Sequence, residues 1–569
     1  MNLRKIGLVV VLTSSLLLPS LAHASGVDEQ FVAPTVSTNG QQGYVASESA
    51  FLSTQGSYFI NYQTSGNQVT AVTACTSATD AACNFTARQA YNAVLPICAS
   101  DAAVDCISAV TAKDASGATL DIQQNGQYPT RRLQDFTGDP AHHIPSGGGA
   151  ALMTIPGATH ASGNQYLLKV SMLSSRDDGS KGQWGLRQLQ AAFYAIKPIT
   201  GTFNDLTVDT NSATYDSVRR ISMRGSTHFA ITPDQQSLCI VVSQNECGLA
   251  YPMPAGISLG FSLRLSEPIV GWLHGRMKSP TISLTSGPNG TQNLTVDAQP
   301  IQVPALATWV SSDLLPPALQ SFYSSHSWSG QALRFTNDTS TAPGAPVSDF
   351  ERSPAGQKTI SYQHIAAQFN AESMAEFVDW LPVVGDKASA DPWLWTLNTM
   401  QSGNGNDNIS KCLNGSTGLA GVVTTNATMY IDGPPQFDKK SGVLNYKVAA
   451  THFQPDGSTL NKGTYDLVMN SKVARCIYGF TSAPVSATVS VTSADGSPDI
   501  STTVVGERNG WLSLGAYNFT YSNPNISVKL TQASATTVTK SVAKSITCAK
   551  GSATKVVTSA TCPPGYKKR

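Results

Sequence analysis

Carboxylates and tryptophans, the residue types of a sugar-cleaving site, gather between residues 372 and 395. The carboxylates are Glu372, Glu376, Asp379 and Asp391, and the tryptophans are Trp380, Trp393 and Trp395. Glycosidases use two carboxylates that flank the scissile bond. Carboxylates along a helix more often form a solvated face, however, and tryptophans more often belong to a core. The pattern therefore marks Trp380, Trp393 and Trp395 as candidate sugar-binding residues and assigns no catalytic residue.

Other patterns with reactive residue types lack the spacing that their chemistry needs. The segment SHSWSG at residues 325–330 places a histidine among serines, but it has no G-x-S-x-G turn to expose a nucleophile. His142 and His143 have no cysteine or further histidine at the spacing of a zinc site. We therefore expect neither a metal nor a cofactor. The sequence favours a protein without catalytic activity and leaves that question open.

The ten cysteines predict disulfide bonds, because an even number of cysteines in an exported chain is typical of a disulfide framework. Three pairs share a C-x7-C spacing. Spacing does not determine connectivity, and the most local solution gives Cys75–Cys83, Cys98–Cys106, Cys239–Cys247, Cys412–Cys476 and Cys548–Cys562. The last pair would close the segment ITCAKGSATKVVTSATCPPGYKKR, residues 546–569, into a small unit.

That segment is basic, although the whole chain has a formal net charge of only +1. From Thr531 onward the charged residues are Lys540, Lys544, Lys550, Lys555, Lys567, Lys568 and Arg569. These seven residues carry a charge of +7. Because the whole chain carries only +1, the part before Thr531 carries −6. The cations either keep a tail in solution or bind an anionic surface such as cell-wall polymer, glycan or lipid headgroups. Nucleic acid is not an expected partner of this segment, because Tyr566 is its only aromatic residue and base stacking needs several.

The first residues predict a secretory signal peptide over residues 1–24. Arg4 and Lys5 are followed by a mostly apolar stretch, residues 6–18, and by the cleavage motif Ala22-His23-Ala24. No later stretch is apolar enough over about 18 residues to predict a transmembrane helix. The sequence therefore predicts a secreted protein that associates with the cell surface, if at all, by non-covalent contacts. It assigns no oligomeric state.

Composition and periodicity predict a mainly β, multi-domain fold with sandwich-like domains. Charged residues make up 13% of the chain, against about 25% in ordinary soluble proteins. Short stretches with alternating apolar residues recur before residue 300 and again from residue 409 to residue 532. Helical spacing is confined to residues 306–325 and 364–382. Pro382 is expected to end the second helix.

These patterns divide the mature chain into five regions. They are a β-rich N-terminal region (25–300), a mixed α/β segment (301–408), a β-sandwich-like domain (409–532), a linker rich in Ser, Thr, Ala and Lys (533–545) and the basic, disulfide-closed module (546–569).

Several stretches resemble large secreted proteins of actinobacteria. They are GWLHGRMKSPTISL, the region from VDWLPVVGDKASADPWLW to VLNYKVAATH, and YDLVMNSKVARCIYGF. The end of the chain resembles a module of the form I-T-C-x-K-G…C-P-x-G-Y-K-K on exported proteins of such bacteria. The resemblance implies export and surface association, and it supplies no catalytic residues.

Two functions follow as expectations. The favoured one is an exported, cell-surface or wall-associated structural or binding protein without catalytic activity. The alternative is a secreted carbohydrate-active hydrolase with its site around residues 372–395.

Overall fold

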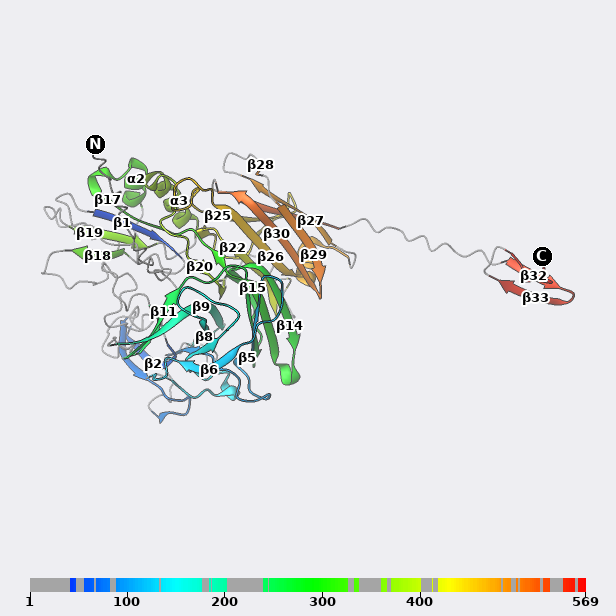
Figure 1. Ribbon diagram of the computed structural model, residues 1–569, viewed down its shortest axis with the longest axis horizontal. Helices are drawn as coiled ribbons and strands as arrows, with labels where there is room; N and C mark the ends of the chain where they lie inside the picture. The colour runs from blue at the N-terminus through cyan, green and yellow to red at the C-terminus, as the bar shows by residue number, and fades with distance from the viewer. Residues whose placement is uncertain are drawn as a thin grey trace, which may run out of the picture.

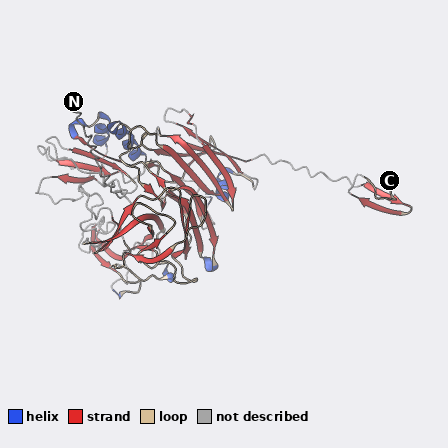
Figure 2. Cartoon of the chain, viewed as in Figure 1, coloured by secondary structure: helices blue, strands red, loops and turns tan. Residues whose placement is uncertain are grey.

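The computed structural model describes a mainly β protein. The described residues are 41–47, 56–65, 68–81, 88–132, 135–176, 184–185, 187–201, 239–243, 245–325, 332–336, 360–365, 370–400, 412, 418–481, 485–492, 498–499, 502–521, 525–532, 546–557 and 561–569. The predicted signal peptide and the predicted linker at residues 533–545 lie outside these residues. Strands dominate, and the α-helices α2 and α3 gather at one end of the molecule (Figure 2). The predicted fold class, a multi-domain, sandwich-like β protein, is confirmed.

A sheet of 15 strands forms the centre of the molecule (Figure 1). Its main path is β29 (Thr502–Arg508), β30 (Trp511–Thr520), β26 (Lys462–Asn470), β22 (Leu419–Thr425), β13 (Gly271–Arg276), β21 (Thr396–Thr399), β9 (Gln188–Thr200), β8 (Gln165–Arg176), β4 (Arg88–Val94), β2 (Tyr58–Ser65) and β3 (Gln68–Ala74). Four strands branch from it: β11 (Glu246–Tyr251) pairs with β9 and β10 (Cys239–Ser243), and β7 (Ala150–Thr154) pairs with β8 and β6 (Gln123–Tyr128).

Smaller sheets complete the body. One contains β14 (Lys278–Ser286), β15 (Gln292–Gln299), β12 (Ser258–Leu265) and β5 (Cys106–Lys113). A second contains β23 (Met429–Tyr430), β25 (Val443–Ala449), β31 (Asn525–Gln532), β27 (Val485–Thr492), β28 (Pro498–Asp499) and β24 (Gln436–Asp438). A third contains β17 (Leu306–Ser311), β1 (Gln41–Ala46), β19 (Ile360–Ile365) and β18 (Ala332–Thr336), and a fourth pairs β16 (Ile301–Gln302) with β20 (Trp393–Leu394).

The central strands are covered on both faces, because successive side chains of a strand point to opposite sides. Leu273 of β13 belongs to the core shared with the β5–β12–β15–β14 sheet, whereas its neighbour Trp272 belongs to the core shared with β25, β27 and β31. Val422 and Val423 of β22 divide in the same way. Every residue of β22 is buried, as expected for a strand enclosed on both faces.

The helices are short and occupy the predicted region only in part. In the described part of the chain they are α2 (Pro317–Ser325), α3 (Ala371–Trp380) and α5 (Ser471–Tyr478), with 3-10 turns at η4 (Pro140–His142), η7 (Pro288–Gly290), η8 (Ser312–Leu314) and η9 (Leu381–Val384). Helix α5 lies in the region predicted as β, so the prediction of strands alone was wrong there. Asn370 caps α3 by accepting a hydrogen bond from the Ser373 amide at 2.8 Å. The helix ends at Trp380, and Pro382 follows in η9, as predicted.

The helical prediction was wrong for residues 306–311 and 364–365, which lie in β17 and β19. Both strands pair with β1, and this long-range pairing overrides the local helical spacing. Strands β1 and β17 approach closely at Gly43, where an added Cβ would lie 2.8 Å from the Trp309 ring.

The sheets do not follow the boundaries drawn from the sequence at residues 300 and 408. The central sheet joins β9 and β13, before residue 300, to β21 between the two boundaries and to β22 beyond residue 408. The terminal sheet of β33 (Ala553–Val557), β32 (Ile546–Lys550) and β34 (Lys567–Lys568) pairs only within itself among the described residues.

Candidate functional site

Two of the three candidate sugar-binding tryptophans are fully enclosed. Trp380 and Trp395 are each 0% exposed and lie in different hydrophobic cores. The Trp395 Nε1–H donates to the Ala298 carbonyl at 3.0 Å, and its ring packs edge-on against Phe193. A sugar ring needs an open indole face, so the prediction that Trp380 and Trp395 bind sugars was wrong. Trp393 is half-buried and packs against the same core as Trp395.

Glu376 is also enclosed, at 0% exposure, and serves a buried network at the helical end of the molecule. The Tyr323 hydroxyl donates to Glu376 Oε1 at 2.5 Å, and the Trp380 Nε1–H donates to the Tyr323 hydroxyl at 2.9 Å. The Trp380 ring stacks on Tyr44 with centroids 5.2 Å apart. Burial, and next the charge of Glu376, raise the pKa of Tyr323. These contacts tie α3 to α2 and β1, which is a structural role.

The other carboxylates of the region have different surroundings. Glu372 is exposed on the first turn of α3, and Asp379 is half-buried near its end. Burial, and next the charge of Asp456, raise the pKa of Asp391 to about 6. Asp391 Oδ1 is buried and has no hydrogen-bond partner among the described residues.

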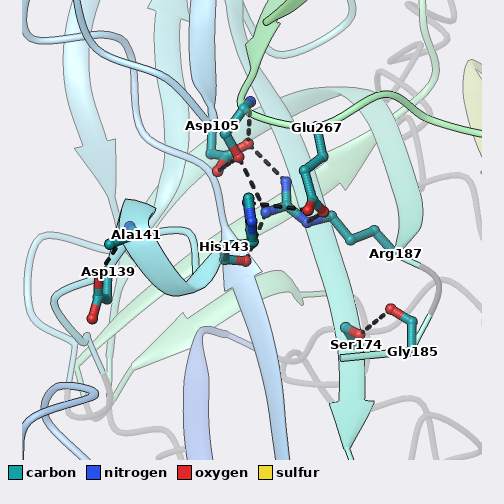
Figure 3. Close-up of polar contacts among 9 residues, drawn as sticks. Asp105, Asp139, Ala141, His143, Ser174, Gly185, Arg187 and Glu267 are labelled. Atoms are coloured by element: carbon teal, nitrogen blue, oxygen red, sulfur yellow. Dashed lines mark hydrogen bonds and ion pairs between the residues drawn. The ribbon is translucent and has the colours of Figure 1, made fainter. Parts of the chain in front are cut away.

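An ionic network not anticipated from the sequence surrounds Arg187 (Figure 3). Arg187, directly before β9, bonds Asp105 Oδ1 at 2.9 Å and donates to the His143 carbonyl at 2.6 Å. The Arg187 Nε lies 3.3 Å from Glu267, which also contacts His143 Nδ1 at 3.0 Å. The Ser266 amide and hydroxyl both donate to Asp105. Asp105 and Arg187 are 82 residues apart in the chain, so no local pattern reveals their pairing.

A second enclosed polar group lies between β13 and the sheet of β25. His274 is 2% exposed, and its ring stacks on Tyr430 with centroids 3.6 Å apart. Arg276 donates to the carbonyls of Thr425, Ala427 and Thr428 and lies over the same tyrosine ring. Burial, and next the Arg276 charge, hold the pKa of His274 well below its usual value. Neither ring nitrogen of His274 has a hydrogen-bond partner in the described part of the chain.

The basic C-terminal module presents exposed cations on a small separate sheet. Its hairpin of β32 and β33 is extended by β34, and the predicted Cys548–Cys562 bond is present. Its five cations, Lys550, Lys555, Lys567, Lys568 and Arg569, are all exposed, and no acidic residue follows Glu507. Cations without acidic neighbours create a positive potential that attracts anions.

Three further predicted disulfides are present: Cys98–Cys106, Cys239–Cys247 and Cys412–Cys476. Cys75 is disulfide-bonded, and its predicted partner, Cys83, lies outside the described residues. Disulfides persist in oxidising compartments, so these bonds indicate a protein that matures outside the cytosol.

The described residues contain no cluster of three or more His, Cys, Asp or Glu side chains that could hold a metal ion. Within the described ranges, no helix is long and apolar enough to cross a membrane.

Comparison with known proteins identifies no relative: no protein-family model, curated protein or solved structure matches the chain. The resemblance to secreted actinobacterial proteins stays a prediction, and the site is interpreted from its own geometry.

Proposed function

We propose that the protein is exported and acts at the cell surface as a non-catalytic binding protein whose basic C-terminal module contacts an anionic wall polymer. The observation that carries this proposal is the module itself: a disulfide-closed sheet with five exposed cations and no acidic residue. Among the described residues, the strands of the module pair only with one another. The disulfides along the body are in keeping with an extracytoplasmic location.

The test is fractionation of the native host expressing the full chain or a variant that lacks residues 533–569. We expect the full chain in the wall fraction and the shortened chain in the medium, with an unchanged circular dichroism spectrum. A second variant, K439Q/K440Q/K462Q, removes three exposed lysines from the body and tests whether loss of positive charge elsewhere also reduces wall association. Equal wall association of the full and shortened chains would overturn the proposal.

The environment of Asp391 supports the hydrolase as a second candidate function. A general acid in glycoside cleavage needs a raised pKa, and Asp391, a half-buried residue beside Trp393, has a pKa of about 6. If the alternative holds, the purified protein releases reducing ends from a wall polysaccharide and Asp391→Asn abolishes the release. No release by the native protein, or equal release by the variant, would reject it.

A further inference from the structure

The register of the terminal sheet places three of its lysines on one face. Cys548 of β32 pairs directly with Lys555 of β33 and with Lys568 of β34. Residues directly opposite each other in antiparallel strands project to the same side. Lys550 follows Cys548 by two positions and therefore projects to that side as well. We call the surface of Lys550, Lys555 and Lys568 the lysine face.

The opposite face has a different character. Ala549 pairs with Thr554 on one side and with Lys567 on the other. Val556 also belongs to this face, by the same alternation, and is 65% exposed. The opposite face therefore carries Lys567 and, two positions later, Arg569, whose amide donates to the Thr547 carbonyl at 2.9 Å. Its other side chains are small, hydroxyl-bearing or apolar.

The disulfide and the final turn lie on the lysine face, between its lysines, because the Cys548 side chain projects to that side. Cys548 is 0% exposed because its side chain is bonded to Cys562. Gly565 has a φ of +85°, and an added Cβ would lie 3.3 Å from the Lys550 Nζ. The turn that contains Gly565 therefore lies beside the Lys550 side chain, which remains exposed.

The spacing of the lysines determines the kind of anion that can use them together. Lys555 and Lys568 are separated by two inter-strand steps, about 10 Å, and Lys550 lies about 7 Å along the strand from Cys548. Three lysines spread over these backbone distances match several separate anionic groups better than a single phosphate or carboxylate. At about 0.1 M salt the screening length is also about 10 Å, so each lysine acts as a separate charge. A chain with regularly repeated anionic groups can neutralise all three.

From these observations we infer that the lysine face binds a linear phosphodiester polymer, with Lys550, Lys555 and Lys568 each neutralising one phosphate. The inference rests on the proposed function and specifies its partner. Ammonium groups commonly bind phosphates and act as point charges, so separate lysines suit phosphates that are spaced along a chain. A lipid surface fits less well, because the exposed Val556 that could enter a bilayer lies on the opposite face.

The test uses the full chain with purified poly(glycerol phosphate) as the probe. Amine labelling followed by mass spectrometry should show protection of Lys550, Lys555 and Lys568 and continued labelling of Lys567. K550Q/K555Q/K568Q should bind about 100-fold more weakly, at about fivefold per lysine removed. It should also lower the slope of log affinity against log salt by about two. The body variant K439Q/K440Q/K462Q has the same net charge and should bind like the native chain.

Each remaining outcome decides against the inference. Equal protection of Lys567, or equal weakening in the body variant, would show that net charge and not the lysine face drives binding. Tighter binding to polygalacturonate would replace phosphate with carboxylate as the ligand. Binding only to vesicles of equal phosphatidylcholine and phosphatidylglycerol would replace the polymer with a lipid surface. In all these cases release of the chain lacking residues 533–569 from the wall would leave the proposed function standing.

Discussion

The ion pair between Asp105 and Arg187 is almost wholly enclosed, with side-chain exposures of 3% and 5%. Removing one partner of a buried ion pair lowers stability more than replacing both partners with apolar residues, because the remaining charge is buried without compensation. The pair holds the start of β5 to the start of β9, and Glu267 adds the segment after β12. The pair therefore connects the central sheet to the β5–β12–β15–β14 sheet. We call the hydrophobic core between these two sheets the first core.

We expect Asp105→Ala to lower the free energy of unfolding by about 3–5 kcal/mol, since Arg187 would stay buried without its main carboxylate. The matched comparison is Lys113→Ala, which breaks the Lys113–Asp297 pair at 2.9 Å, where Lys113 is 40% exposed. That change should cost less than about 1 kcal/mol. Urea unfolding of both variants measures the difference, and equal losses would contradict the structural role of the Asp105–Arg187 pair.

His274 should make the protein less stable in acid. Its pKa is lower in the folded protein than in the unfolded chain, so the unfolded chain binds the proton more readily. Stability is therefore complete above about pH 6.5 and falls as the pH drops below that value, by up to about 1.4 kcal/mol per pH unit. Protonation would place a second cation beside Arg276 between two sheets.

The measurement is urea unfolding of the native protein and His274→Phe between about pH 5 and pH 7. Phenylalanine keeps a ring against Tyr430 and cannot take up a proton, so the variant should lose stability less steeply on acidification. Burial also lowers the pKa of His160, and burial raises the pKa of Asp391, which acts with the opposite sign. Both groups are present in both proteins and cancel in the comparison. Parallel curves would contradict the prediction.

At the scale of single elements, β22 shows how closely the central sheet is packed. Gly421 lies in the middle of this strand, where an added Cβ would be 2.5 Å from the Trp272 ring and 2.6 Å from the Val468 carbonyl oxygen. The carbonyl belongs to the paired strand β26 and cannot move without disturbing the sheet. Glycine is therefore required here by the close approach of Trp272 and β26.

Gly421→Ala should lower the free energy of unfolding by about 1–3 kcal/mol, the usual cost of overpacking a core. Gly506 of β29 offers a matched control, because it lies exposed in a strand of the same sheet with nothing within 4 Å of an added Cβ. Gly506→Ala should change stability by less than about 0.5 kcal/mol. Thermal unfolding of the two variants would refute the packing argument if Gly421→Ala were neutral.

At the scale of the whole molecule, local features were predictable from the sequence and distant pairings were not. The alternating stretches before residue 300 predicted strands such as β8, and short spacing predicted Cys98–Cys106 and Cys548–Cys562. The pairing of β9 with β21 joins segments about 200 residues apart, and periodicity carries no information about such partners. For the same reason the sequence could not tell that Trp395 faces a core while the cations of the terminal module stay exposed.

The order of strands in the central sheet also predicts which fragments can fold. A chain ending at residue 300 would lack β21 and β22, so both edges of β13 would be unpaired. Leu397 and Val422 would be missing from the first core, and β9 would lose its partner β21. Unpaired apolar strand edges favour aggregation. A fragment of residues 41–300 should therefore be unfolded or insoluble, although the sequence pattern marks residue 300 as a boundary.

A fragment of residues 41–532 should behave differently, because it keeps every strand of the central sheet and, of the described residues, lacks only the terminal module. It should unfold at the same temperature as the full chain, within about 2 °C, since a change of 1 kcal/mol shifts the midpoint of even a large domain by about 2–4 °C. Circular dichroism melts of the two fragments and the full chain provide the measurement. A cooperative transition in the 41–300 fragment would show that the first core closes without β21 and β22, and a lowered midpoint in the 41–532 fragment would show that the module supports the body.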